Sequence, residues 1–294
     1  MPRISANTIE LFYESFGSAS APTVLLIMGL GAQLTRWNIE LCDLLVHRGY
    51  RVIRFDNRDS GLSTRCDGLA LPDFSALLRG ASPFALPYTL ETMAADSIGL
   101  LDALEIEQAH LVGASMGGAI AQIIAARYPE RTHSLTSIMS SSGNPMLPPP
   151  TSAAAMSLFA PLPVTQDRQS VVQDAIARHR SVASPAYPTA EEDLELLFGQ
   201  EYDRSFNPQG VARQLGALIA NGDRRALLKR IACPTVVLHG KDDPLINLAC
   251  GEDVANHIPE AELRVVDGMG HDFPVALSAT FADAICQAAT RAAC

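Results

Sequence analysis

The chain has 294 residues, of which 48% are hydrophobic and 18% charged, and its net charge is −10 at pH 7. This composition is typical of a globular protein with a large core and excludes an intrinsically disordered chain. The negative charge would repel a phosphate backbone or an anionic membrane surface, so nucleic acid is not expected as a partner.

The cysteine pattern and the N-terminal residues both indicate in which cellular compartment the protein is expected. Six cysteines are scattered without a Cys-x-x-Cys pair, which disfavours a disulfide framework or a zinc cluster and is typical of a reducing compartment. Glu10 and Glu14 interrupt the stretch where a signal peptide needs an apolar core. The longest apolar run, 24–30, is shorter than the about 20 residues that span a bilayer. We therefore expect a cytoplasmic protein without membrane insertion.

The first half of the chain alternates strand and helix patterns. Continuous apolar runs such as 23–28 are typical of strands buried on both faces, and apolar residues at helical spacing follow them. Strands are predicted at 9–14, 23–28, 50–55, 109–113 and 135–140, and helices at 37–47, 89–104 and 116–127. This order predicts a mostly parallel sheet with helices on both faces, the α/β class.

The composition changes after 143. Residues 144–187 are rich in Pro, Ser and Ala, and helices are predicted at 171–179, 191–198 and 210–220 without a clear strand. The strand and helix alternation then resumes, with strands at 235–239 and 263–266 and helices at 248–257 and 274–293. The chain is thus predicted to have an α/β core of residues 1–143 and 231–294, interrupted by a helical insertion at 144–230.

A nucleophile is indicated by the sequence Gly113-Ala114-Ser115-Met116-Gly117. This Gly-x-Ser-x-Gly pattern lies between a predicted strand and a predicted helix, which is the context of a nucleophile elbow. The turn is sharp, so the residues two before and two after the serine must be small, and both are glycine. We expect Ser115 to be the catalytic nucleophile.

A serine hydroxyl needs a base, and His271 is the best candidate. It follows the last predicted strand in a loop, where an open α/β sheet places its site. The remaining histidines are expected to be structural or exposed: His47, His110, His133, His179, His239 and His257.

The acid that orients this base is expected after the strand at 235–239. No Asp or Glu occurs from 131 to 166, so the loop after the preceding strand cannot supply it. Asp242 and Asp243 are both available, and Asp243 is favoured because Pro244 makes a rigid turn after it. Serine, acid and histidine then follow in the order of an α/β-hydrolase triad.

The oxyanion hole is predicted from two backbone N–H groups. One belongs to Met116, directly after the nucleophile, and the other to Leu30 in the loop after the strand at 23–28. No metal-binding motif, P-loop or dinucleotide fingerprint is found, so neither a metal nor a cofactor is expected.

These segments resemble the α/β-hydrolase superfamily, in the form that carries a helical cap. The resemblance rests on the segments 28–31, 56–63, 113–118 and 268–271, covers nearly the whole chain and is least specific at 144–230. Among branches the chain is most similar to the aclacinomycin methylesterase group, then to enol-lactonases and cofactor-free haloperoxidase-like esterases. One departure is Met28-Gly29, where many relatives have His-Gly. The 56–63 segment is interpreted as a structural loop in which Arg58 is tied down by ionic or backbone contacts.

An apolar substrate site is expected beneath the cap. The aromatic residues chosen as substrate-binding candidates are Trp37, Phe159, Phe198 and Phe206. An apolar pocket favours a small, moderately hydrophobic, neutral ester. The first hypothesis is therefore a serine carboxylic-ester hydrolase that forms an acyl-enzyme. Lactone opening or perhydrolysis on the same triad, and a slow-turnover small-molecule receptor, are the alternatives. A homodimer is retained as an option.

Overall fold

A computed structural model describes residues 2–78, 86–159 and 167–292, without the side chains of residues 78, 157 and 159. Its centre is an eight-stranded sheet in the order β1-β2-β4-β3-β5-β6-β7-β8. The strands are β1 (Arg3–Ala6), β2 (Ile9–Phe16), β3 (Thr23–Ile27), β4 (Arg51–Phe55), β5 (Ala109–Ala114), β6 (Thr132–Ile138), β7 (Thr235–Gly240) and β8 (Glu262–Val266). The strands β4, β3, β5, β6, β7 and β8 are parallel, and β1 and β2 pair antiparallel at one edge. The predicted α/β class with a mostly parallel sheet is confirmed.

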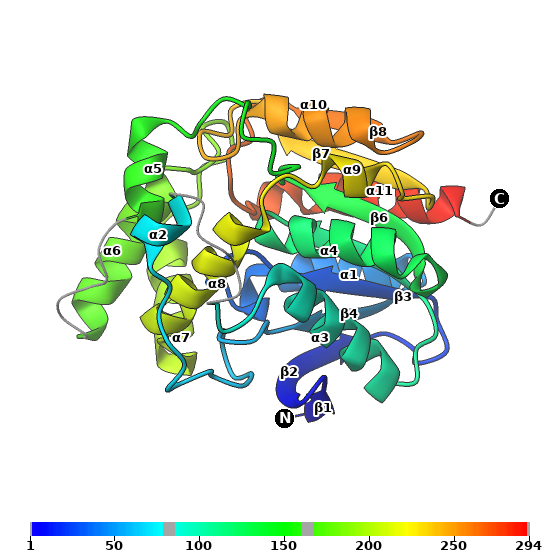
Figure 1. Cartoon of the computed structure of the whole chain (residues 1–294), viewed down its shortest axis with the longest axis horizontal. Helices are drawn as coiled ribbons and strands as arrows, with labels where there is room; N and C mark the ends of the chain where they lie inside the picture. The colour runs from blue at the N-terminus through cyan, green and yellow to red at the C-terminus, as the bar shows by residue number, and fades with distance from the viewer. Residues whose placement is uncertain (1, 79–85, 160–166, 293–294) are drawn as a thin grey trace.

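Helices cover both faces of this sheet (Figure 1). One face carries α1 (Ile39–His47) and α11 (Ser278–Arg291), and the other carries α3 (Leu90–Ala103), α4 (Met116–Arg127) and α10 (Leu248–His257). Successive residues of β3 alternate between the two cores: Leu25 belongs to the α3/α4 side, and Val24 and Leu26 to the α1/α11 side. The buried apolar run that predicted this strand is therefore explained by packing on both faces.

The helical segment between β6 and β7 lies at one end of the sheet. It contains α5 (Ser152–Phe159), α6 (Arg168–Arg180), α7 (Glu191–Arg204), α8 (Pro208–Asn221) and α9 (Arg225–Leu228). In Figure 1, α5 to α8 gather at the left together with α2 (Phe74–Leu78), while α9 lies over the sheet core. We call residues 144–230 the insertion. Its division from the core at 143 and 231 as a separate domain stays a prediction.

Helix ends differ from the predicted ones where a side chain caps the backbone or a 3₁₀ turn precedes the helix. The helix predicted to begin at Trp37 begins at Ile39, because the side chain of Asn38 accepts the N–H of Leu41 at 2.8 Å. Short 3₁₀ turns at Leu34–Arg36, Pro129–Arg131 and Val275–Leu277 precede or follow the longer elements. The last helix accordingly begins at Ser278 rather than at 274.

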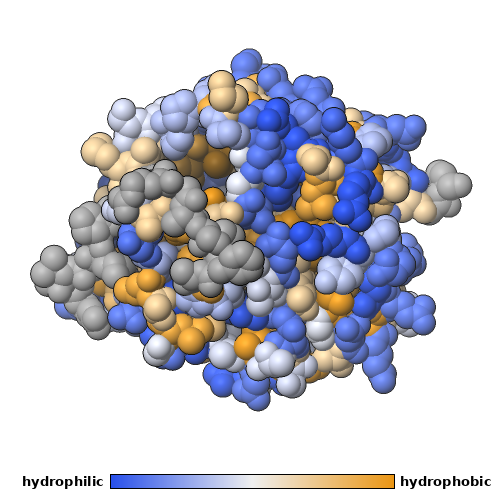
Figure 2. Space-filling view, viewed as in Figure 1, coloured by the Kyte–Doolittle hydropathy of each residue, from blue (hydrophilic) through white to orange (hydrophobic). Residues whose placement is uncertain are grey.

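The surface of the described residues is mixed in character. In the view of Figure 2, apolar residues outside the grey atoms form separate patches among hydrophilic ones. Within the described ranges, no helix combines the length and the apolar character needed to cross a membrane. The five cysteines in the described part of the chain are free thiols, and no group of three metal-binding side chains is found there.

Candidate active site

Ser115 lies in the turn between β5 and α4. Its φ of 54° is positive, a backbone conformation that residues with a side chain rarely adopt and that costs energy. Two glycines make the turn sterically feasible. A Cβ on Gly113 would stand 2.1 Å from the carbonyl oxygen of Gly117, and one on Gly117 would stand 2.1 Å from that of Ile27. The turn holds Ser115 at the carboxyl end of β5, directly before the N-terminus of α4.

The three predicted triad residues form one hydrogen-bonded chain. The Nε2 atom of His271 is 3.0 Å from Oγ of Ser115, and its Nδ1 atom is 2.7 Å from Oδ2 of Asp243. The carboxylate of Asp243 is fully buried, and the imidazole of His271 is nearly so. Because Nδ1 faces a carboxylate, it carries the proton and leaves Nε2 as the acceptor that faces the serine hydroxyl. This arrangement can move a proton from Ser115 to His271.

The two adjacent aspartates of the loop after β7 face different partners. Oδ1 of Asp243 accepts the backbone N–H groups of Leu245 (2.9 Å) and Ile246 (2.8 Å), which fixes the carboxylate while Oδ2 reaches the histidine. Asp242 is exposed, and its Oδ2 accepts the N–H of Gly268 at 2.8 Å. The carboxylate next to His271 is therefore that of Asp243.

A second histidine lies beside the Asp243 carboxylate. His239, on β7, is completely buried, and its Nε2 atom is 2.7 Å from the carbonyl oxygen of Ile246 and 3.8 Å from Oδ2 of Asp243. Burial lowers the pKa of His239, against the opposing effects of the Ile246 carbonyl and Asp243. A neutral His239 leaves the negative charge of Asp243 available to His271.

The predicted oxyanion donors lie on either side of the nucleophile. Among the described residues, no protein acceptor takes the N–H of Leu30 or that of Met116. A Cβ on Gly29 would stand 3.1 Å from Cβ of Ser115, so the backbone before Leu30 passes directly over the serine. The Met116 N–H is the first of α4, where the helix dipole favours negative charge. Together these groups can stabilise a developing oxyanion.

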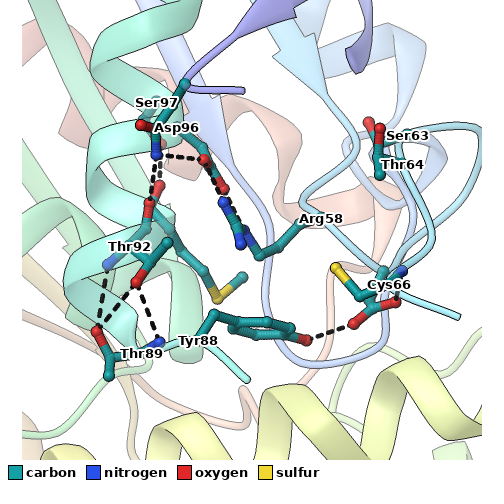
Figure 3. A network of polar contacts seen from close by, with 12 residues as sticks. Arg58, Ser63, Thr64, Cys66, Tyr88, Thr89, Thr92, Asp96 and Ser97 are labelled. Carbon is teal, nitrogen blue, oxygen red and sulfur yellow. Dashed lines mark hydrogen bonds and ion pairs between the residues drawn. The ribbon is translucent and has the colours of Figure 1, made fainter. Parts of the chain in front are cut away.

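The 56–63 segment, which is the loop after β4, is held in place by a buried polar network. Arg58 binds Asp96 of α3 through two hydrogen bonds of 2.5 and 2.6 Å, as Figure 3 shows. In the same network Tyr88 donates to Asp59 at 2.7 Å, and Asp59 also receives a two-bond contact from Arg213 of α8. The structure thus ties down Arg58 by ionic contacts and links this loop to the insertion.

Of the four predicted substrate-binding aromatics, three have side chains that the structure describes, and these pack in the sheet core or within the insertion. Trp37 is fully buried in the α1/α11 core, with its ring 4.8 Å from that of Phe273. Phe198 is buried in a small cluster within the insertion, and Phe206 packs against Tyr202 at 5.4 Å. The side chain of Phe159 lies outside the described residues. Trp37 and Phe198 are core residues in the structure, and a substrate-binding role for the four stays a prediction.

Several supporting contacts of the site were not foreseen. The backbone N–H of His271 donates to the carbonyl of Val182 at 2.7 Å, and that of Gly270 donates to Oγ of Ser184 at 2.8 Å. Ser184 in turn donates to the buried carboxylate of Asp272. The segment between α6 and α7 therefore holds the histidine loop in place. No local motif marks these residues, because the contact joins parts of the chain about 90 positions apart.

Comparison with known proteins places the chain in a family. The family model described as the alpha/beta hydrolase fold matches residues 22–275. A rhodomycin D methylesterase of Streptomyces peucetius is 30% identical, with 99% of this chain and 98% of that protein covered. A 3-oxoadipate enol-lactonase of Acinetobacter baylyi is 28% identical, with 90% and 87% covered.

Solved structures agree on the fold. The enol-lactonase from Burkholderia xenovorans has a TM-score of 0.73 at 22% identity, covering 98% of this chain and 100% of that one. The meta-cleavage product hydrolase from Pseudomonas fluorescens has a TM-score of 0.76 at 21% identity, covering 99% and 98%. The resemblance inferred from the sequence is thereby confirmed, and the chain belongs to the alpha/beta hydrolase fold family, as a hydrolase whose relatives include an esterase and a lactonase.

Proposed function

We propose that the protein is a serine carboxylic-ester hydrolase that works through an acyl-enzyme. The observation that carries this proposal is the hydrogen-bonded chain from Oγ of Ser115 through the imidazole of His271 to the buried carboxylate of Asp243. A serine hydroxyl becomes a useful nucleophile when an oriented base accepts its proton, and this geometry supplies both the base and the group that orients it.

The proposed reaction proceeds in two halves. Oγ of Ser115 attacks the ester carbonyl carbon while Nε2 of His271 takes the hydroxyl proton, and the N–H groups of Leu30 and Met116 bind the carbonyl oxygen as it becomes negative. The intermediate collapses, and the alcohol leaves with the proton from His271. Water then attacks the acyl group with His271 again acting as base, which releases the acid and restores Ser115.

The charges at the junction between the insertion and the core support a neutral substrate. Three arginines in this region each face a carboxylate, and a fourth, the buried Arg224, directs its N–H groups at neutral oxygens of Gln122, Asn221, Gly222 and Ser141. The pairs are Arg36 with Glu201 (2.7 Å), Arg204 with Asp56 (2.7 Å) and Arg213 with Asp59 (2.8 Å). An arginine that already binds protein acceptors is less available for a charge-assisted hydrogen bond to a substrate carboxylate. We therefore propose a moderately hydrophobic, uncharged ester, with the insertion acting as a cap over the site.

Lactone opening on the same triad is the second candidate. It is favoured by the similarity to the enol-lactonase of Acinetobacter baylyi, and it uses the same attack on a carbonyl, except that the leaving alcohol stays attached to the acyl group. A comparison of open-chain esters with lactones of matched size separates the two reactions.

A substrate panel with active-site titration tests the proposal. We expect steady turnover on p-nitrophenyl or methyl esters and a decrease in kcat of about 10⁴-fold or more in Ser115→Ala, with folding unchanged by circular dichroism. A burst of one equivalent followed by a stall would instead indicate the slow receptor. Equal turnover by wild type and Ser115→Ala would refute the proposal.

A further inference from the structure

A buried glutamine of the insertion contacts the loop that carries Leu30. Gln214 lies on α8, which Figure 1 shows between the other helices of the insertion and the core. Its side chain is completely shielded from solvent. Oε1 accepts the backbone N–H of Gly31 at 2.8 Å, and Nε2 donates to the carbonyl of Arg58 at 2.7 Å and to Oγ of Ser60 at 3.0 Å. A single amide therefore joins α8, the Leu30 loop and the 56–63 segment.

The loop with the Leu30 N–H is held on both sides by side-chain amides. On the core side, Nδ2 of Asn57 donates to the carbonyl of Met28 at 2.9 Å. On the insertion side, Gln214 takes the N–H of Gly31, and the N–H of Leu30, between the two contacts, has no acceptor among the described residues.

Close packing reinforces the contact between α8 and this loop. Gly31 has a φ of +66°, and a Cβ there would stand 2.9 Å from a methyl group of Val211, one turn before Gln214 on α8. The backbone of the loop thus touches the helix directly, and movement of α8 would be passed on to Leu30.

The orientation of the Gln214 amide is determined by its partners. The carbonyl of Arg58 can only accept, so the NH₂ group must face it, and the oxygen must face the N–H of Gly31. A flipped amide would bring two donors together at Gly31 and leave the carbonyl of Arg58 opposite an oxygen. The site is therefore specific for a glutamine side chain in this one orientation.

We infer that Gln214 is a positioning residue for the oxyanion hole, an inference that rests on the proposed function. By accepting the Gly31 N–H it fixes the Leu30–Gly31 peptide and with it the direction in which the preceding N–H of Leu30 points. An oxyanion donor acts only when it is aimed at the developing charge, and loss of one such donor costs about 10²- to 10³-fold in kcat. A Leu30 N–H group that is present but points away from the oxyanion should therefore cause part of this decrease in kcat.

The test compares Gln214→Met with a matched change on the same helix. Methionine has a similar length but no amide, so the Gly31 contact disappears. We expect kcat to decrease about 10- to 100-fold with KM changed less than about threefold, and the rate of phosphonate reaction at Ser115 to decrease in parallel. The control is Asn221→Leu, which removes the amide contacts of Asn221 with Glu91 (3.1 Å) and Arg224 (2.6 Å) at the far end of α8. We expect its kcat to stay within about threefold of wild type.

A second variant at the same position, together with the turnover of the wild-type protein, makes the result decisive. If Gln214→Met does not fold, Gln214→Asn decides, because its amide is one methylene too short to reach Gly31 and a loss of kcat is again expected. Wild-type kcat in either folded variant, or an equal loss in Asn221→Leu, would overturn the inference. Failure of the proposed function is recognised separately, because wild-type protein would then not turn over esters through Ser115.

Discussion

Replacement of Asp243 by Asn changes one atom at the centre of the site. The N–H groups of Leu245 and Ile246 both point at Oδ1, so the amide oxygen of Asn must take that position. The NH₂ group then takes the place of Oδ2, which is 2.7 Å from Nδ1 of His271. Because Nδ1 of His271 would then face an N–H donor, Nδ1 must become the acceptor, and the imidazole proton moves to Nε2. The atom that should take the proton of Ser115 is thereby blocked.

The expected loss is large because two effects combine. The imidazole is held in the unproductive tautomer, and the imidazolium formed in the transition state lacks its counter-charge. We expect kcat to decrease by about 10³- to 10⁴-fold, which corresponds to about 4 to 5.5 kcal/mol of activation free energy. KM should change little, since the carboxylate is buried behind the imidazole and does not reach the substrate.

The adjacent residue provides the matched control. Asp242→Asn has the same chemistry one position earlier but affects only an exposed contact with Gly268, so kcat should decrease by less than about tenfold. Steady-state kinetics on the best p-nitrophenyl ester, with active-site titration to count competent enzyme, measures both variants. A mild Asp243→Asn together with a damaged Asp242→Asn would refute the assignment of the acid. Mild effects in both would refute the triad itself.

Three further outcomes concern stability. Burial, and to a lesser extent His133, lower the pKa of His110 to about 4, so between pH 6.5 and 4 the unfolded chain is protonated at this histidine and the folded protein is not. The free energy of unfolding should therefore decrease by about 3 kcal/mol as the pH falls over this range. Urea titrations at both pH values measure this decrease. Arg213→Met should cost about 3 to 5 kcal/mol by leaving the buried Asp59 unpaired, and the double variant with Asp59→Asn should recover most of that loss in the same titrations. Gly113→Ala should lower Tm by several degrees, because its methyl group would meet backbone atoms at 2.1 Å, and an unchanged Tm in differential scanning calorimetry would contradict the packing described here.

The sheet could be predicted from sequence because burial on both faces leaves continuous apolar runs. Every predicted strand is present in the structure, with ends that differ by a few residues. The strand β1 was missed, since its four residues pair only with β2 at the sheet edge and three of them stay exposed or half-exposed. Edge strands of this kind carry no apolar run, and only their tertiary pairing defines them.

The candidate site was predictable to the extent that its residues occur in local motifs. The glycines around Ser115 belong to a Gly-x-Ser-x-Gly motif and the Asp-Pro pair after β7 marks a turn, so both are visible in the sequence. Gln214 and Ser184 were missed because each acts on a loop far away in the chain. Aromatic residues were chosen as substrate contacts by type, and residue type alone does not separate a pocket wall from a core, so their role stays a prediction.

Identification of the residue that becomes acylated tests directly whether Ser115 is the nucleophile. Wild-type protein would be treated with a fluorophosphonate, and with a slowly deacylated ester quenched in acid, and its peptides analysed by mass spectrometry. We predict one stoichiometric modification on the peptide that contains Ser115, absent after His271→Ala lowers the reactivity of the hydroxyl. Modification of a different residue, or full ester turnover by protein whose Ser115 is unmodified under both treatments, would show that Ser115 is not the nucleophile.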